Sequence, residues 1–182
     1  MKKNICVFCG SSSGNDVAFS SAAKVFALEI VKNNLNLVYG GAHVGLMGTL
    51  ADAVLAKGHE VIGVIPKSMM IKEIAHDGLT KLHVVGSMHE RKQLMYDLSD
   101  YFVALPGGLG TLDELFEIIT WKQIGTHAKP IGLWNLNGYY DQLIGFIDKA
   151  KNLGFIPQTL EKLILVEADP KNLLKRLTAE QD

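Results

Sequence analysis

The sequence predicts an α/β protein, a single doubly wound, Rossmann-like domain over residues 1–182 with a mainly parallel sheet of about seven strands. Short apolar runs alternate with amphipathic stretches from end to end, which is the order of consecutive β–α units. Runs such as Val-Ile-Gly-Val-Ile at 61–65 are apolar on both faces, as in a parallel sheet covered by helices on each side. The length suits one domain with a sizeable core and is short for two.

The apolar runs and the periodic stretches give the elements in order along the chain. Helices are expected where apolar residues recur three and four positions apart, as at Leu112, Leu115, Phe116 and Ile119. Strands are expected where short, continuous apolar runs occur. The expected strands are 4–9, 35–39, 60–65, 81–85, 101–105, 130–134 and 163–166, and the expected helices are 16–33, 45–57, 88–98, 111–124, 139–152 and 170–179.

Composition and charge exclude several classes of protein. The formal net charge is −1 with no basic block, so we expect no nucleic-acid partner. No apolar stretch approaches ~18 residues and the N-terminal apolar run is too short for a signal peptide, so we expect no membrane partner. Cys6 and Cys9 have C-x-x-C spacing, but in a strand they face opposite sides. Core cysteines in a reducing cytosol, and hence a cytoplasmic protein, are the interpretation that we favour.

Four unusual loops follow expected strands, at 10–14, 40–45, 86–92 and 106–114. In doubly wound folds ligands bind beyond the carboxyl ends of the strands, so these loops are expected to converge on one edge. The chain has neither the Gly-Lys-Ser/Thr of a Walker A loop nor the G-x-G-x-x-G fingerprint of a dinucleotide site. Four of its histidines, at 43, 76, 83 and 89, share no metal-ligand spacing. We therefore expect no metal and no cofactor.

The loop at 106–114 reads Pro-Gly-Gly-Leu-Gly-Thr-Leu-Asp-Glu. Gly107, Gly108 and Gly110 would let backbone N–H groups approach an anion at a helix N-terminus, and Thr111 adds a hydroxyl. A tight β–α turn with glycines chosen for their dihedral angles is the alternative. The diglycine at Gly40 and Gly41 and the serines at Ser11 and Ser12 follow other strands, and together they favour the anion site.

Two segments match the capping box at a helix start. Thr111 would be an N-cap with Glu114 three residues later, so the cap gives Glu114 a structural explanation. Ser87 and Glu90 would begin the helix at 88 in the same way. Arg91 then lies in the first turn, where the helix dipole repels a cation, yet on the apolar stripe of that helix. An inward arginine at this end of a helix is expected to bind an anion.

These residues resemble the LOG ("Lonely guy") family of cytokinin riboside 5′-monophosphate phosphoribohydrolases, formerly described as possible lysine decarboxylases. Residues 106–114 match its P-G-G-x-G-T-x-x-E signature, and Met88-His89-Glu90-Arg91-Lys92 matches a second block, M-H-x-R-K. The resemblance spans nearly the whole chain. A pyridoxal-phosphate decarboxylase needs a Schiff-base lysine paired with an acid in a much larger chain, and no credible pair is present.

The resemblance implies hydrolysis of the N-glycosidic bond of N6-substituted AMP or AMP, giving the free base and ribose 5-phosphate. It assigns catalysis to Arg91 and Glu114. The substrate-binding residues that we expect are Ser11, Ser12, Gly40, Gly41, Glu73, Met88, Lys92, Gly107, Gly108, Gly110, Thr111, Asp113 and Thr120. One departure is that the second loop reads Gly-Gly-Ala-His, where many members have a third glycine.

Two further expectations complete the hypothesis. The resemblance implies a homodimer, and the irregular stretch at 66–80, with Met69, Met70 and Ile71 exposed, offers a contact between subunits. The rival interpretation is a nucleotide-binding or carrier protein of the same fold without turnover. Such a carrier would not require the pair of Arg91 and Glu114.

Overall fold

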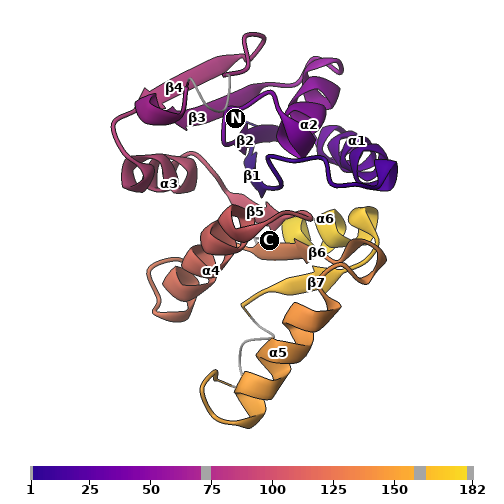
Figure 1. Ribbon diagram of the computed structural model, residues 1–182, viewed down its shortest axis with the longest axis vertical. Coiled ribbons are helices and arrows are strands. Elements are labelled where there is room, and N and C mark those ends of the chain that lie inside the picture. Colours follow the sequence, from indigo (N-terminus) through magenta and orange to yellow (C-terminus); the bar gives the residue numbers. More distant parts are fainter. Residues whose placement is uncertain (1, 71–74, 158–162, 180–182) are drawn as a thin grey trace.

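The structure is a computed structural model that describes residues 2–70, 75–157 and 163–179. In this part of the chain, seven strands form one sheet in the order β4-β3-β2-β1-β5-β6-β7, and every neighbouring pair is parallel (Figure 1). The predicted doubly wound α/β fold is therefore confirmed. The apolar runs predicted the strands to within about two residues, and the central strands β2, β5 and β6 are buried along their whole length, as such runs indicate.

The strands are β1 (Asn4–Phe8), β2 (Asn36–Tyr39), β3 (Val61–Pro66), β4 (Lys81–Val85), β5 (Tyr101–Ala104), β6 (Ile131–Trp134) and β7 (Leu165–Glu167). The α-helices are α1 (Val17–Lys32), α2 (Gly45–Leu55), α3 (Met88–Asp97), α4 (Leu109–Gln123), α5 (Asp141–Asn152) and α6 (Pro170–Ala179). Two short 3₁₀ turns, η1 (Lys67–Met69) and η2 (Leu136–Gly138), follow β3 and β6.

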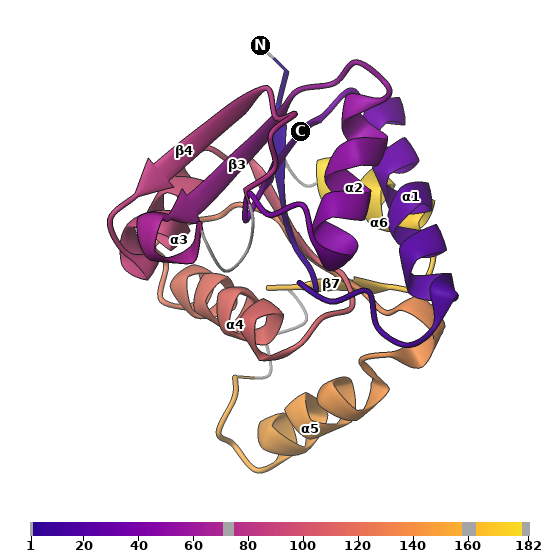
Figure 2. The same cartoon turned by 45° about the horizontal axis from the view of Figure 1, so that its top comes forward.

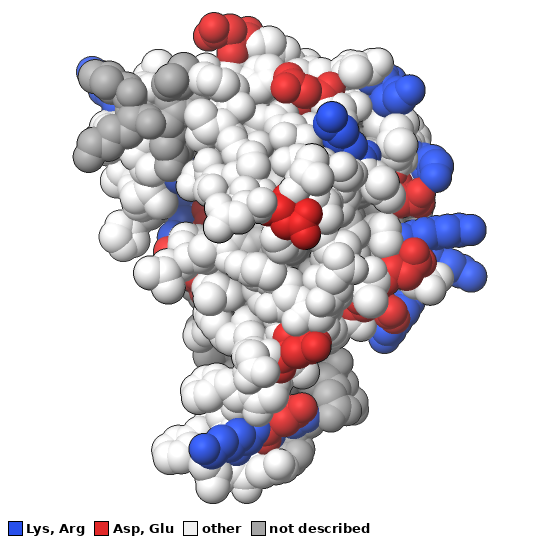
Figure 3. Space-filling view, turned by 45° about the vertical axis from the view of Figure 1, so that its right-hand side comes forward, with Lys and Arg blue, Asp and Glu red and all other residues white. Residues whose placement is uncertain are grey.

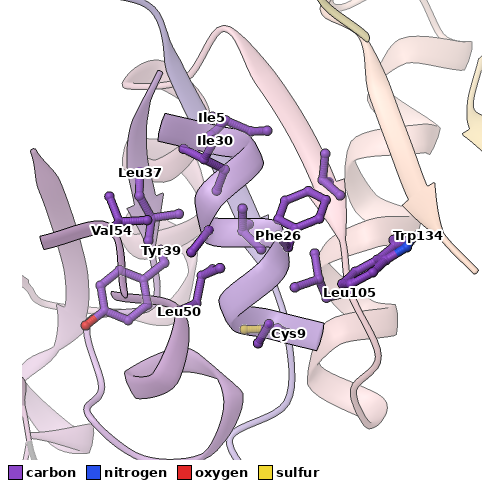
Figure 4. Close-up of a cluster of buried hydrophobic side chains, with 14 of the residues drawn as sticks. Ile5, Cys9, Phe26, Ile30, Leu37, Tyr39, Leu50, Val54, Leu105 and Trp134 are labelled. Atoms are coloured by element: carbon purple, nitrogen blue, oxygen red, sulfur yellow. The ribbon is translucent and has the colours of Figure 1, made fainter. Parts of the chain in front are cut away.

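Helices cover both faces of the sheet (Figure 2). Helices α1, α2 and α6 pack on one face, and α3, α4 and α5 contribute to the apolar cluster on the other. In the first cluster, the ring of Phe26 on α1 lies 5.1 Å from that of Trp134 on β6, close to Leu105 (Figure 4). Complete burial of such a side chain contributes roughly 1.5–3 kcal/mol to folding, so the sheet is held firmly on both sides.

The two cysteines behave as the strand pattern predicts. Both are free and buried, and Cys6 belongs to one apolar cluster while Cys9 belongs to the other. Burial, with the nearby Glu114 carboxylate as a smaller cause, raises the pKa of the Cys9 thiol far above its usual value. A thiol held neutral in this way is a poor nucleophile and a poor metal ligand, which supports the interpretation as core cysteines.

The order of the strands in the sheet determines where a ligand site is expected. β1 pairs with β2 on one side and with β5 on the other, so connections leave β1 and β5 in opposite directions. A crevice opens at such a switch point, beyond the carboxyl ends of the strands. Here the two following loops touch, because the Gly10 N–H donates to the Pro106 carbonyl at 3.1 Å. The first loop and the signature loop thus meet as predicted.

The surface carries mixed charge. On the face shown in Figure 3, Lys and Arg interleave with Asp and Glu rather than gathering into one field. Within residues 2–70, 75–157 and 163–179, the helices are too short or too polar to cross a lipid bilayer.

Candidate active site

A cavity of about 240 Å³ lies at the carboxyl edge of the sheet, between the β1 loop and the starts of α3 and α4. We call it the site cavity. A second cavity of about 230 Å³, the adjoining pocket, shares Gly10, Ser11 and Gly108 with it. The site cavity is lined by Cys9, Gly10, Ser11, Met47, Met69, Met88, Arg91, Gly108, Leu109, Gly110, Thr111, Asp113 and Glu114. Together the two cavities have the size of an ordinary small-molecule site.

The structure gives a steric reason for glycine at only one of the three signature positions, 107, 108 and 110. A Cβ on Gly107 would lie 2.1 Å from Thr111 Oγ1 and 2.8 Å from the Gly10 nitrogen, so close packing inside the protein explains that glycine. A Cβ on Gly108 or Gly110 would meet nothing within 4 Å, and neither residue has a positive φ. The protein itself therefore gives no steric reason for two of the three. An approaching ligand would explain glycine at these two positions, since a residue without a side chain lets the backbone come close to an anion.

The capping-box prediction for Thr111 and Glu114 is wrong. α4 begins at Leu109 with Gly108 as its N-cap, so Thr111 is the third helical residue and Glu114 the sixth. A carboxylate a turn and a half into the helix cannot serve the N-cap backbone. Thr111 is instead buried beside Gly107 and lines the site cavity. The capping explanation for Glu114 is thereby removed, and its partly buried side chain lines the site cavity.

The prediction for the start of α3 holds in part. Ser87 is the N-cap, and its Oγ accepts from the Glu90 N–H at 3.1 Å. Glu90 Oε2 accepts from the Gly86 N–H at 2.8 Å rather than from the cap residue.

Arg91 points inward, as its place on the apolar stripe of α3 predicts, and only 5% of it is exposed. Nη2 donates to the Gly40 carbonyl at 3.2 Å, and Nη1 lies 3.8 Å and 3.7 Å from the sulfurs of Met69 and Met88. Nε has no hydrogen-bond partner among the described residues. These acceptors are neutral, and burying a charge is costly unless it is paired. The guanidinium is thus arranged to receive an anion or an electron-rich ring.

The second loop is shaped around this arginine. A Cβ on Gly40 would lie 2.0 Å from Arg91 Nη2, so only glycine leaves room for the guanidinium. Gly41 has a φ of +81°, which favours glycine for conformational reasons. The room for Arg91 at Gly40 and the positive φ at Gly41 explain the diglycine, and Ala42, the next residue, is fully buried.

The side chains of Lys92 and Asp113, which are adjacent in the sequence to Arg91 and Glu114, pair with each other. Lys92 Nζ lies 2.7 Å from Asp113 Oδ2 and 3.3 Å from Glu117 Oε2. Burial lowers the pKa of Lys92, but these two carboxylates outweigh it and the pKa is raised. Lys92 lines a separate cavity of about 540 Å³ between α3 and α4, here called the α3–α4 groove. Asp113 lines the site cavity, but its carboxylate pairs with Lys92.

Of the other predicted site residues, some line the site cavity or the adjoining pocket and others lie elsewhere. Ser11, Met88 and Thr111 line the site cavity, and Ser12 lines the adjoining pocket. Thr120 is exposed farther along α4 and donates to the Phe116 carbonyl at 2.7 Å. Glu73 and Ile71 lie outside the described residues. The roles assigned to all these residues in substrate binding stay predictions.

The structure also adds residues that sequence reasoning missed. Met47 and Met69 line the site cavity, and Met69 faces Arg91 rather than standing exposed, which corrects the expectation for that residue. Tyr139 lines the adjoining pocket and donates to the Gly107 carbonyl at 2.8 Å. Their place in the site depends on tertiary structure, because Met47 reaches it from α2, Met69 from η1 and Tyr139 from the turn after β6. Among the described residues, no group of three or more His, Cys, Asp or Glu side chains could hold a metal ion.

Fold and site together define a Rossmann-like α/β protein with a glycine-rich loop at a helix N-terminus and a buried arginine that lines the same cavity as two carboxylates. The family model described as "Possible lysine decarboxylase" matches residues 47–177. The chain is 50% identical to cytokinin riboside 5′-monophosphate phosphoribohydrolase LOG1 of Arabidopsis thaliana over 175 residues, which are 96% of this chain and 82% of that protein. It is 48% identical to the probable cytokinin riboside 5′-monophosphate phosphoribohydrolase LOGL6 of Oryza sativa subsp. japonica, over 97% of this chain and 71% of that one. The chain belongs to this family of LOG proteins, and the predicted membership is confirmed.

Solved structures with the same fold include two proteins of a different kind. A molybdenum cofactor binding protein from Rippkaea orientalis aligns with a TM-score of 0.74 over 100% of this chain and 99% of that one, at 21% identity. A Moco carrier protein from Chlamydomonas reinhardtii aligns with a TM-score of 0.73 over 100% and 98%, at 19% identity. At this level of identity the likeness concerns the fold alone.

Proposed function

We propose that this chain hydrolyses the N-glycosidic bond of N6-substituted AMP, or of AMP, giving the free base and ribose 5-phosphate. The observation that carries the proposal is the site cavity itself, where open glycines at a helix N-terminus lie beside Arg91 and Glu114. The relatives at about 50% identity are phosphoribohydrolases by name, which supports the same activity here.

The glycine loop, defined as residues 105–110, would bind the 5′-phosphate. Its Gly108 N–H belongs to the N-cap of α4 and its Gly110 N–H to the first turn, where the helix dipole favours an anion. The buried Thr111 hydroxyl lies at the same place. Binding energy from the phosphate, which does not react, is then used to position the ribose against the catalytic groups.

Glu114 would act at the ribose carbon. Breaking the C1′–N9 bond sends its electron pair to the base and leaves an oxocarbenium-like ribosyl centre. A carboxylate stabilises that cation and takes a proton from the attacking water as the new C1′–O bond forms. The departing base takes up a proton in its turn, so the products are the neutral base and ribose 5-phosphate.

Arg91 would supply positive charge in the same cavity. Its guanidinium is held by one carbonyl and two sulfurs, none of which neutralises it. It can therefore stabilise negative charge that develops on the leaving base or clamp the nucleotide. A carrier protein of the same fold needs no such pairing of a buried arginine with a carboxylate, so we favour the hydrolase over the carrier.

A comparison of two substrates tests the proposal. The protein is incubated with AMP or isopentenyl-AMP and, in parallel, with the corresponding nucleoside, and the released base is measured by chromatography. We expect base release from the monophosphate and poor release from the nucleoside. No release from either substrate would contradict the hydrolase, and equal release from both would contradict phosphate binding by the glycine loop.

We further propose a homodimer, in a single domain over residues 1–182, acting in the cytoplasm. The family resemblance supports the dimer, and Met70, Val17 and Leu109 are exposed apolar side chains that a second copy would cover. Two free, buried cysteines suit a reducing compartment. Light scattering at the assay concentration tests the dimer, and an active monomer would contradict it.

A further inference from the structure

We propose that Tyr139 is a positioning residue for the phosphate of the substrate, because it fixes the orientation of the glycine loop from the neighbouring strand connection. The inference rests on the proposed function, in which that loop binds the 5′-phosphate. Tyr139 itself touches neither the reacting carbon nor the base in this account. Its hydroxyl acts through the peptide that joins Gly107 to Gly108.

Three successive carbonyls of the glycine loop are held by donors from outside it. Leu105 O accepts from Tyr140 Oη at 2.6 Å, and Pro106 O accepts from the Gly10 N–H at 3.1 Å. Gly107 O accepts from Tyr139 Oη at 2.8 Å. A loop rich in glycine is otherwise free to rotate its peptides. Here every peptide between β5 and the N-cap of α4 is held at its oxygen.

Fixing a carbonyl also fixes the N–H on the other side of the same peptide. All peptides of the described chain are trans, so the Gly107 carbonyl and the Gly108 N–H point in opposite directions. Tyr139 lies in the adjoining pocket and not in the lining of the site cavity, whereas Gly108 lines both. With its carbonyl held towards Tyr139, this peptide turns its N–H away from the adjoining pocket. That is the orientation an anion at the start of α4 requires.

The tyrosines reach the loop because β6 is the sheet neighbour of β5. A sharp turn follows β6, with positive φ at Asn137 and Gly138. The Asn135 side chain stabilises it, since Oδ1 accepts from the Tyr140 N–H at 2.8 Å and Nδ2 donates to Asp141 Oδ1 at 2.7 Å. The turn thereby presents two adjacent tyrosines to alternate carbonyls of the glycine loop.

The tyrosine rings are also held in place. The Tyr139 ring packs edge-to-face against Phe19 at 5.7 Å and against Tyr140 at 4.8 Å. Tyr140 is 3% exposed, and burial, with Tyr139 as a smaller cause, raises the pKa of its phenol well above the usual value. A phenol held neutral remains a hydrogen-bond donor. Tyr139 is partly exposed, so its hydroxyl can be removed with less disturbance to the core than that of Tyr140.

The alternative is that Tyr139 only attaches the β6–α5 connection to the body of the protein. The variant Tyr139→Phe separates the two, because it keeps the ring contacts and removes the donor. Dissociation constants are measured by calorimetry for ribose 5-phosphate, which the glycine loop would bind, and for adenine, which it would not. Steady-state kinetics with AMP and thermal unfolding are recorded on the same preparations. Tyr101→Phe, at the opposite end of β5, is the matched control.

We expect Tyr139→Phe to weaken ribose 5-phosphate binding about 5- to 10-fold, the scale of one hydrogen bond that orders a binding group. The KM for AMP should rise by a similar factor, while kcat and the adenine constant change by less than about twofold. Tyr101→Phe should leave the ribose 5-phosphate constant as in the parent. A lower melting temperature with unchanged ribose 5-phosphate binding would overturn the proposal, and so would equal weakening of adenine and ribose 5-phosphate.

The two proposals can fail separately. If the parent releases base from AMP and Tyr139→Phe binds ribose 5-phosphate as tightly as the parent, only the positioning role is lost. If the parent releases no base but Tyr139→Phe still weakens ribose 5-phosphate selectively, the positioning role stands and the hydrolase is lost.

Discussion

Arg91 and Lys92 are neighbours in the sequence, but they line two different regions of the molecule. Arg91 and Glu114 line the site cavity, whereas Lys92, one residue after Arg91, lines the α3–α4 groove and pairs with Asp113 at 2.7 Å. Lys92 is paired with two carboxylates, that of Asp113, which lines the site cavity, and that of Glu117, which lines the groove. In the site cavity, the buried guanidinium is held by a carbonyl and two sulfurs. The difference favours a structural role for Lys92 and a ligand-binding role for Arg91, and the latter stays a prediction.

The largest effect is expected from removing the buried cation. Arg91→Ala should lower the turnover of AMP by about 100- to 1,000-fold, the range seen when one electrostatic stabiliser of a transition state is lost. Lys92→Ala should have a much smaller effect, because Lys92 is already paired. The two variants are compared by their turnover per folded molecule, with folding checked by circular dichroism. Similar losses in both variants would contradict the division between the two regions.

A smaller loss should follow from displacing the same guanidinium without removing it. In Gly40→Ala, the new Cβ would stand 2.0 Å from Arg91 Nη2, so the arginine must shift. We expect turnover to fall about 10- to 100-fold, because misplacement of a catalytic group by about 1 Å costs that much. The double variant with Arg91→Ala should be no worse than Arg91→Ala alone. Additive losses would show that Gly40 acts by another route.

The glycine loop offers a change with effects of opposite sign. Gly110 is helical, and a Cβ there meets nothing within 4 Å, so Gly110→Ala should raise the free energy of unfolding by up to about 1 kcal/mol. If an anion approaches this backbone, the same methyl group should weaken AMP binding about 10-fold. In Gly145→Ala in α5, the new Cβ also meets nothing within 4 Å, so this variant should show the same rise in unfolding free energy without weaker AMP binding. Unchanged AMP binding in Gly110→Ala would mean that the glycine serves only the helix start.

The smallest effect is expected in the α3–α4 groove. A double-mutant cycle of Lys92→Ala and Asp113→Asn should give a coupling of about 0.2–1 kcal/mol in unfolding free energy, with turnover changed only a few-fold. Since the pKa of Lys92 is raised in the folded protein, this contribution is present below the ordinary lysine value of 10.5 and is lost as the pH rises above it. Denaturant titrations at two pH values measure the coupling energy and its dependence on pH. A coupling that grows at higher pH would contradict the ion pair.

Much of this arrangement follows from the sequence, and the exceptions have physical causes. The strands and the inward direction of Arg91 were predictable because burial leaves an apolar period in the sequence. The start of α4 was misplaced because Leu109 lies between two glycines, which have low helix propensity, while Thr111 and Glu114 match a cap pattern. Tertiary contact overrides that pattern, since Thr111 packs against Gly107. The contact of Tyr139 with Gly107 was not predictable, because it depends on β6 lying beside β5.

The most direct test of the account compares two adjacent carboxylates on α4. Glu114→Gln keeps the size of the side chain and removes its charge, and Asp113→Asn does the same one residue away. We predict that Glu114→Gln lowers the turnover of AMP at least about 100-fold, the low end of general acid–base contributions. Its unfolding free energy should stay within about 1 kcal/mol of the parent, the scale of one hydrogen bond. Asp113→Asn should stay within a few-fold of parental turnover. Near-parental turnover in Glu114→Gln would contradict the central claim that this carboxylate acts on the ribosyl centre.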